Sequence, residues 1–252
     1  MKKITIALSA AFIVGSLSSV NAEFTRDQLE EATGISIGYN TSWSSHYVWR
    51  GESQSSKDMS PAIGVDLGHS SGFYLGAWSG SITNGTYGAE FDVYGGYAFD
   101  VGPLSFDVGD LYYLYPGESN EVQFNEYYFS VGTEIPLEMV ADDFAVSPYA
   151  YFAYAPKWFG ANTPDVFYTE LGIDVPIPGT PFSVSYTYGD INVDDLEGDA
   201  EKANTVDGWD YYYITLGFGE ILGLDTSVTY HSSPGYKANA GQEGFFVSLG
   251  HE

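Results

Sequence analysis

The chain alternates apolar and polar residues with a period of two over most of its length. In FSVSYTY (182–188), Phe182, Val184 and Tyr186 fall on one face, and the serine and threonine residues between them fall on the other. Such alternation is typical of a β-strand with one apolar and one polar face. Repeats at i, i+3 and i+4 are rare, and the exception, RDQLEEAT (26–33), predicts a short helical turn ahead of the first strand.

The alternating segments predict twelve strands. Their expected bounds are about 35–49, 61–69, 73–81, 89–99, 104–115, 124–134, 144–155, 166–175, 182–188, 209–219, 224–231 and 244–250. Long and short connections nearly alternate between them, and the first connection is a long one. An even strand number with this alternation is typical of an outer-membrane barrel whose two termini lie on the periplasmic side. The predicted fold is therefore an all-β, transmembrane, antiparallel up-and-down β-barrel.

A secreted β-sandwich also uses many short strands, and it is the main alternative fold. Two features favour the barrel. The apolar faces carry Trp43, Tyr47 and Trp49 near a strand end, where a lipid interface selects aromatic residues. The opposite faces carry acids, which a sandwich core would not tolerate unpaired.

The first residues have the features of a secretory signal. MKKITIALSAAFIVGSLSSVNA has two lysines, an apolar stretch and a small-residue end, which predicts a signal peptide over 1–22 cleaved after Ala22. We expect a short periplasmic segment over 23–34 and the barrel over 35–252. The chain has no cysteine, so disulfides cannot stabilise it.

The composition is strongly acidic. After Ala22, six lysine and arginine residues stand against 34 acids, which gives a formal charge of −28. Binding to nucleic acid or to an anionic lipid surface through charge is therefore not expected, because both would be repelled. Charge alone leaves a soluble secreted protein open, but 17% aromatic residues with 30 glycines favour many short strands joined by tight turns.

The stretch YVWRGESQS (47–55), followed by PAIGVDLGHSSGFYLGAWSGS (61–81), resembles the TorF family of porins. The resemblance continues through FDVYGGY, DLYYLYPG, NEYYFSVG and TELGIDVPIPG, and so covers nearly all of the chain after Ala22. It implies an outer-membrane barrel and brings no catalytic residues. One departure is the end of the chain, which stops at His251-Glu252 where such barrels usually close on an aromatic residue.

The alternation assigns one arginine and several acids to the barrel interior. Arg50 is expected there as a structural tie between carboxylates or as part of a constriction, and the two roles are compatible. By the alternation, Asp110 lies on the apolar, lipid-facing side of its strand. A bulge at Gly109 is expected to turn its side chain inward. The predicted lumen carboxylates are Glu90, Asp92, Asp107, Glu126, Glu134, Glu170 and Asp174.

Tyrosines form a second inward set. They are expected either to fill a narrow barrel, the favoured interpretation, or to guide a ring-bearing solute by contact with its faces. Barrels of ~8 strands have a filled interior and those of 16–18 strands have an aqueous channel, so twelve strands leave the question open. The predicted lumen tyrosines are Tyr94, Tyr113, Tyr128, Tyr168 and Tyr211.

No catalytic, metal or cofactor site is predicted. The acidic loop DINVDDLEGDAE does not have the ligand spacing of an EF-hand and is expected to be a solvated loop. His231 and Ser232 are adjacent in a strand and so point to opposite faces, which does not make a catalytic pair.

The sequence thus predicts a porin-like channel in the bacterial outer membrane, without enzymatic activity. It is expected to pass small hydrophilic solutes passively, with a preference for cations because of its acidic lumen. Its expected partners are outer-membrane lipids, lipopolysaccharide and the barrel-insertion machinery. The alternative is a closed or plugged barrel with a structural or surface-interaction role.

Overall fold

A computed structural model describes residues 26–83, 88–117, 122–141, 144–158, 164–193, 208–234 and 242–251. The predicted signal peptide (1–22), most of the acidic loop and Glu252 lie outside these residues.

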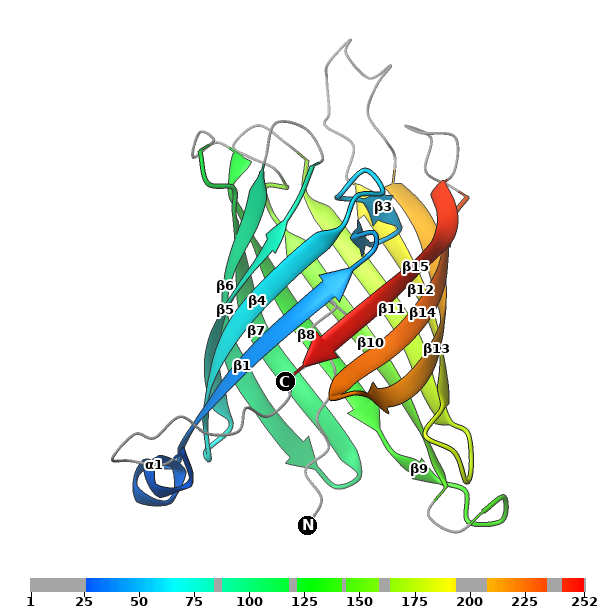
Figure 1. Cartoon of the computed structure of the whole chain (residues 1–252). Helices are drawn as coiled ribbons and strands as arrows, with labels where there is room; N and C mark the ends of the chain where they lie inside the picture. Colours follow the sequence, from blue (N-terminus) through cyan, green and yellow to red (C-terminus); the bar gives the residue numbers. More distant parts are fainter. Residues whose placement is uncertain are drawn as a thin grey trace.

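Twelve long strands form the wall, as predicted (Figure 1). The described part of the chain begins with helix α1 (Arg26–Thr33), which covers the residues predicted to be helical. No helix among the described residues is long and apolar enough to cross a membrane. Three two-residue strands, β2 (Val48–Trp49), β3 (Glu52–Ser53) and β9 (Ile135–Pro136), lie between the long ones. The long strands are β1 (Ile35–Ser44), β4 (Ser60–His69), β5 (Phe73–Ser81), β6 (Ala89–Val101), β7 (Leu104–Leu114), β8 (Phe124–Thr133), β10 (Ala145–Ala155), β11 (Val166–Pro176), β12 (Ser183–Val193), β13 (Gly208–Ile221), β14 (Leu224–Ser233) and β15 (Gln242–His251).

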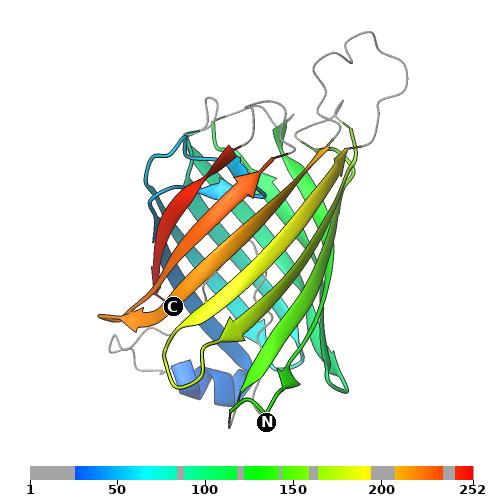
Figure 2. The ribbon, with the colours of Figure 1, turned by 90° about the vertical axis from the view of Figure 1, so that its right-hand side faces the viewer.

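The sheet closes on itself. Each long strand pairs antiparallel with the next one along the chain, and β1 pairs with β15 over Thr41↔His251 to Ser44↔Ser248. Figure 2, turned by 90° about the vertical axis, shows the tilted strands running around the cylinder, with β15 (red) at the left. Closure removes the unpaired edges of this sheet, so every long strand has two hydrogen-bonded neighbours.

The two faces of the wall differ in chemistry. The outward face leaves large apolar side chains exposed, such as Phe245 at 72%, Phe73 at 63% and Ile63 at 60%. Outward aromatic rings also form a contact series across β5, β6, β7, β8 and β10, with neighbouring centroids 4.8–6.4 Å apart. The members of this series are Phe73, Tyr97, Phe99, Phe106, Phe129 and Phe152. Such a continuous apolar surface requires a non-aqueous neighbour.

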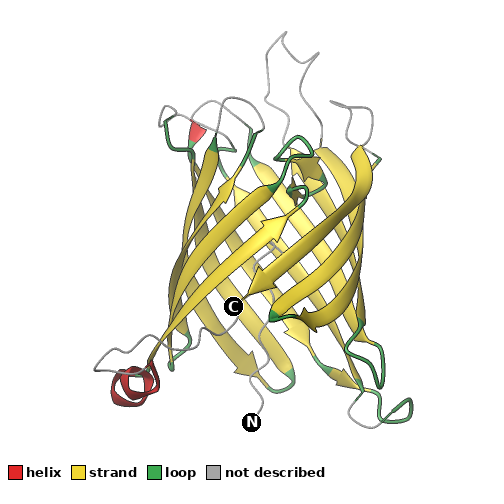
Figure 3. Ribbon diagram, in the orientation of Figure 1, coloured by secondary structure: helices red, strands yellow, loops and turns green. Residues whose placement is uncertain are grey.

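The first strand is shorter than predicted. It ends at Ser44, where the chain leaves the wall and forms the small hairpin β2–β3 within the barrel (Figure 1). Arg50 and Gly51, at the hairpin's two-residue turn, both have positive φ, 47° and 80°. This is the geometry that matches the twist of two antiparallel strands. The hairpin lies at the opposite end of the barrel from α1 (Figure 3), and the two ends are called the hairpin end and the α1 end below.

The hairpin overturns part of the predicted aromatic interface. Tyr47 and Trp49 were expected to face lipid, but both pack against the buried cluster inside the barrel. The prediction is wrong for these two residues. Alternation distinguishes the lipid side from the lumen side only within a strand of the wall, and the chain has left the wall at this point. Trp43 stays in β1, between Pro61 and Leu249 and on the same phase as the exposed Tyr39. A role for Trp43 at a lipid interface therefore remains a prediction.

The expected inward bulge at Asp110 is also wrong. Strand β7 pairs in unbroken register with β6 and β8, with Asp110 opposite Gly95 and Tyr127. Asp110 stays on the outward face, where the Asn125 side-chain amide donates to both of its carboxylate oxygens, at 3.0 and 2.9 Å. A local amide partner thus satisfies this acid, and no change of register is needed.

Candidate functional site

Most of the predicted lumen residues lie inside the barrel. Among the carboxylates, Glu90, Asp92, Asp107, Glu126 and Glu170 are buried, and Asp174 is half-buried. Glu134 is exposed just beyond the end of β8, so its assignment to the lumen is wrong, because the strand phase no longer applies outside the wall. Among the tyrosines, Tyr113, Tyr128, Tyr168 and Tyr211 are buried, and Tyr94 is half-buried. The strand phases fix these positions, whereas the role of each residue in transport remains a proposal.

Arg50 lies at the tip of the hairpin, and its side chain is only 8% exposed. Its Nη1 donates to Glu126 Oε2 at 2.7 Å, and its Nη2 donates to Glu126 Oε1, so the pair is bidentate. The guanidinium also stacks on two rings, with its carbon 3.7 Å from the Tyr168 centroid and 4.5 Å from the Trp49 centroid. This planar arrangement is one that arginine makes and lysine cannot.

Further hydrogen bonds fix the hairpin to several parts of the wall. The Trp209 indole N–H donates to the Arg50 carbonyl at 2.8 Å, and the Gly51 N–H donates to the Tyr213 hydroxyl at 2.7 Å. The Ser53 N–H donates to Gln242 Oε1 at 2.8 Å. Together with the Arg50–Glu126 pair, these bonds attach the hairpin to β8, β13 and β15.

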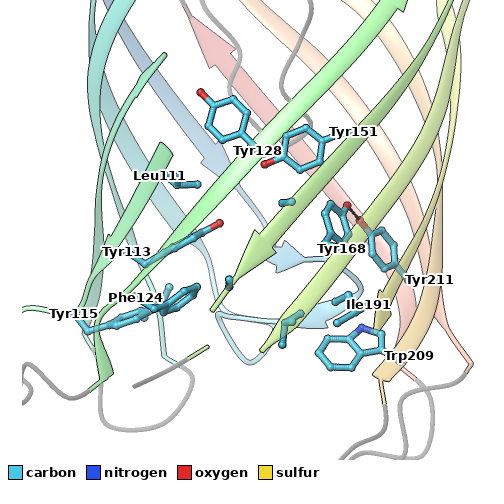
Figure 4. Packing of buried hydrophobic residues seen from close by; sticks show 14 residues of the cluster. Leu111, Tyr113, Tyr115, Phe124, Tyr128, Tyr151, Tyr168, Ile191, Trp209 and Tyr211 are labelled. Carbon is cyan, nitrogen blue, oxygen red and sulfur yellow. Dashed lines mark hydrogen bonds between the residues drawn. The ribbon is translucent and has the colours of Figure 1, made fainter. Parts of the chain in front are cut away.

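The layer around the hairpin is densely packed. Side chains on the inward faces of β6, β7, β8, β10, β11, β12 and β13 are almost inaccessible to water at this level. Figure 4 shows rings from different strands pointing toward the barrel interior, with the Tyr168 and Tyr211 hydroxyls directed at one another. The hairpin and these rings fill the lumen at this level, and we call them the plug layer. Its buried apolar members include Leu111, Tyr113, Phe124, Tyr151, Tyr168, Ile191, Trp209 and Tyr211.

Tyrosine hydroxyls satisfy the buried carboxylates. Glu170 accepts hydrogen bonds from Tyr211 at 2.7 Å, from Tyr149 at 2.9 Å and from Tyr168. Glu126 accepts one from Tyr151 at 3.2 Å besides its pair with Arg50. Because a buried ionised group needs several donors, these rings are part of the electrostatics as well as of the packing.

Glycines make room for the tyrosine rings. Tyr94 lies directly across from Gly76, Tyr128 from Gly109 and Tyr149 from Gly172 in neighbouring strands. A Cβ on any of these glycines would lie 2.2–2.3 Å from the opposite ring. The missing side chains let the rings lie flat along the wall, so much of the glycine content has a packing role.

The plug layer holds more carboxyl groups than cationic groups. Among the described residues, Arg50 is the cation of this layer, and it stands against Glu90, Asp92, Glu126 and Glu170. One oxygen of Asp92, Oδ1, is buried without a hydrogen-bond partner. In the described part of the chain, no group of three or more His, Asp and Glu side chains is arranged to hold a metal ion.

Two histidines lie where the hairpin meets the wall. The His46 and His231 rings are 5.5 Å apart, and Phe246 contacts both. His46 Nε2 lies 2.7 Å from Ser53 Oγ. Burial lowers the pKa of His46 from its usual 6.5, and the nearby Lys57 ammonium lowers it further. The folded state, with the hairpin in the lumen, is therefore more stable when His46 is neutral than when it is protonated.

Acidification is expected to weaken the contribution of His46 to stability. Since the folded pKa is depressed, this contribution is complete above the unfolded value near 6.5 and is lost as the pH falls below it. The melting temperature of the natural chain should exceed that of His46→Gln by more at pH 7.5 than at pH 5. The check is thermal unfolding of both proteins in detergent at each pH. A difference that does not change with pH would contradict the assignment.

Sequence reasoning missed the hairpin itself. The available signal was the Arg-Gly pair at 50–51 followed by a polar run, which is compatible with a tight turn. Because Tyr47 and Trp49 continued the alternation of the first strand, the apolar pattern outweighed that signal.

Comparison with solved structures places the fold among porins. The KdgM porin matches with a TM-score of 0.56 at 9% identity, covering 84% of this chain and 98% of that one. The NanC porin matches with a TM-score of 0.56 at 11% identity, covering 84% and 97%. A structure of KdgM in complex with disordered oligogalacturonate matches with a TM-score of 0.55 at 9% identity, covering 86% and 98%. At these identities the likeness shows the fold alone.

The search of curated proteins finds no match. These comparisons do not confirm the resemblance to the TorF family, which remains a prediction. A family model described as "Bacterial protein of unknown function (Gcw_chp)" matches residues 28–242, from α1 to the start of β15. The chain therefore belongs to the Gcw_chp family of bacterial proteins.

Proposed function

We propose that this protein is an outer-membrane channel for small hydrophilic solutes. The observation that carries the proposal is a closed twelve-stranded barrel that is apolar on its outer face and lined with carboxylates and tyrosines inside. Such a wall suits acyl chains outside and water or solute inside. The porin folds that it resembles support the same class of function.

The proposed orientation puts the α1 end in the periplasm and the hairpin end outside. Most turns at the α1 end are short, such as 70–72, 102–103 and 222–223, the exception being residues 134–144 between β8 and β10. The connections at the hairpin end are longer on average, as is typical of the outer side of such barrels. Outer-membrane lipids, lipopolysaccharide and the barrel-insertion machinery are then the partners of the wall. The signal sequence would bring the chain to that machinery.

We further propose that the channel prefers cations. Asp107 and Asp174 lie on the inward face on the α1 side of the plug layer, where they add to the carboxylates of that layer. Lumen charge of one sign attracts ions of the other sign. The hairpin fills the lumen at the plug layer, so we expect the single-channel conductance to be small as long as the hairpin stays in its position. No step of the proposal is catalytic.

A second candidate is a closed barrel with a structural or surface role. The specific observation in its favour is the plug layer, whose inward side chains have almost no contact with water. The two candidates differ in whether the hairpin ever leaves its position.

Ion flow through the purified protein in a planar bilayer tests the proposal. In a KCl gradient we expect discrete steps with a reversal potential that shows K⁺ preference. The double variant Asp107→Asn/Asp174→Asn should lower this preference, because it removes two lumen charges. Glu138→Gln is the matched control, since Glu138 is exposed outside the long strands. Anion preference would contradict the lumen assignment, and absence of any conductance would favour the closed barrel.

A further inference from the structure

The wall of the barrel contains a complete receptor for a guanidinium group, which the chain's own Arg50 occupies. We define the guanidinium seat by Glu126, Tyr151, Tyr168 and Glu170, which come from β8, β10 and β11. All four belong to the wall. Their occupant comes from a separate element, the β2–β3 hairpin, 76 residues before Glu126.

The seat matches guanidinium in shape as well as charge. Glu126 offers two carboxylate oxygens to two nitrogens, and Tyr168 presents its ring face at 3.7 Å from the guanidinium carbon. A flat, forked cation uses both features, whereas a spherical metal ion or an ammonium group cannot do so equally well. The Tyr151 hydroxyl, 3.2 Å from Glu126 Oε1, holds the carboxylate in position.

Without Arg50, the seat would keep its buried carboxyl groups but lose the cation that faces them. Glu126 and Glu170 are each 1% exposed, and Asp92 lies close enough to Glu126 for their charges to interact. Asp92 Oδ1 is buried without a partner. A vacated seat would thus leave buried carboxylates uncompensated, and this would draw in another cation.

The hairpin is small enough to move as a unit once its hydrogen bonds to β8, β13 and β15 are broken. Its two strands have two residues each and pair over Val48↔Ser53 and Trp49↔Glu52 alone. Arg50 adopts a φ of 47°, a conformation that arginine seldom takes. The segment that follows, from Ser56 to Met59, is exposed. The Gln54 N–H donates to the Tyr47 carbonyl at 2.8 Å and the Tyr47 N–H donates to Ser55 Oγ at 2.9 Å, so the hairpin is a short local unit. Its place in the lumen depends on its contacts with the wall.

We propose that the guanidinium seat binds small organic cations that carry a guanidinium group, and that Arg50 is a tethered competitor which such a solute displaces. This inference rests on the proposed channel function and names its class of solute. Displacement of Arg50 would release the hairpin tip and open the plug layer. Binding of the solute would therefore open the path that the solute takes.

The test uses the full chain with Arg50→Ala and methylguanidinium chloride as the probe. In detergent, Arg50→Ala should melt roughly 10 °C lower than the natural chain, because Glu126 loses its partner. Millimolar methylguanidinium should raise that melting temperature by several degrees in a saturable way. Methylammonium chloride at equal concentration should raise it by less than half as much. Arg50→Ala/Glu126→Gln should show no response specific to methylguanidinium.

A second measurement covers the case in which Arg50→Ala fails to fold. Methylguanidinium added to the hairpin side of the natural channel should raise the current at least twofold over methylammonium at the same concentration. Equal responses to the two cations, in either assay, would overturn the inference. Cation preference in KCl without any effect of methylguanidinium would contradict the proposed binding of guanidinium solutes, while the proposed channel function would stand. Saturable binding of methylguanidinium without any conductance would contradict the proposed channel function, while the guanidinium-binding site would stand.

Discussion

Glu126→Gln is expected to destabilise the protein by about 3–5 kcal/mol, the usual cost of removing one partner from a buried ion pair. The Arg50 guanidinium would stay buried among rings but lose its bidentate carboxylate. Because a neutral amide cannot compensate that charge, the hairpin tip should leave the lumen and single-channel conductance should rise severalfold. Thermal unfolding in detergent and bilayer recording measure the two effects.

Glu134→Gln is the matched control for this substitution. Glu134 is exposed between β8 and β9, so the same chemical change there should shift stability by less than ~0.5 kcal/mol. Replacing both partners, as Arg50→Met/Glu126→Leu, should restore most of the lost stability, since a buried pair is often replaceable by apolar residues of similar volume. If Glu126→Gln melts like Glu134→Gln, the pair contributes little and the hairpin is held by its other contacts.

Gly51→Ala is expected to unseat the hairpin by steric conflict. A Cβ on Gly51 would lie 2.6 Å from the Tyr211 Cβ and 3.0 Å from the Ser233 Cβ, which are attached to the wall. Its φ of 80° adds backbone strain for any residue with a side chain. We expect a loss of ~2 kcal/mol in the free energy of unfolding and a severalfold higher conductance.

Gly102→Ala separates strain from steric conflict. Gly102 also has positive φ, 63°, but a Cβ there would meet nothing within 4 Å, and the residue lies in a turn at the α1 end. This control should lose ~1 kcal/mol and keep the natural conductance. Equal conductance in the two variants would show that the hairpin does not control the path.

The two substitutions act on the hairpin from different sides. Glu126→Gln removes an attraction at its tip, and Gly51→Ala adds a repulsion beside it. If both raise conductance, the plug layer is a gate in the proposed channel. If both lower stability without any current, the layer is a permanent part of the interior, and the closed barrel is the better description.

The sequence by itself determined the wall. Alternation in a β-strand is local, since successive side chains point to opposite faces whatever the strand pairs with. The twelve strands and the inward phase of residues such as Glu90 and Glu170 therefore followed from the order of residues alone. The strand boundaries were predicted less accurately. Strand β12 was expected to end at Tyr188 but runs to Val193, because pairing with Trp209 and Gly208 of β13 extends it through the polar residues Asp190 and Asn192.

Only the tertiary structure decided what fills the barrel. The sequence placed Arg50 in the lumen but could not show that it reaches there on a hairpin, since Tyr47 and Trp49 continue the alternation of the strand before them. Its carboxylate partner, Glu126, lies 76 residues away, and the choice among several lumen acids depends on closure of the whole cylinder. Contacts of that kind arise from packing across the barrel interior. The alternation of residues along one strand does not show which side chains from distant strands meet there.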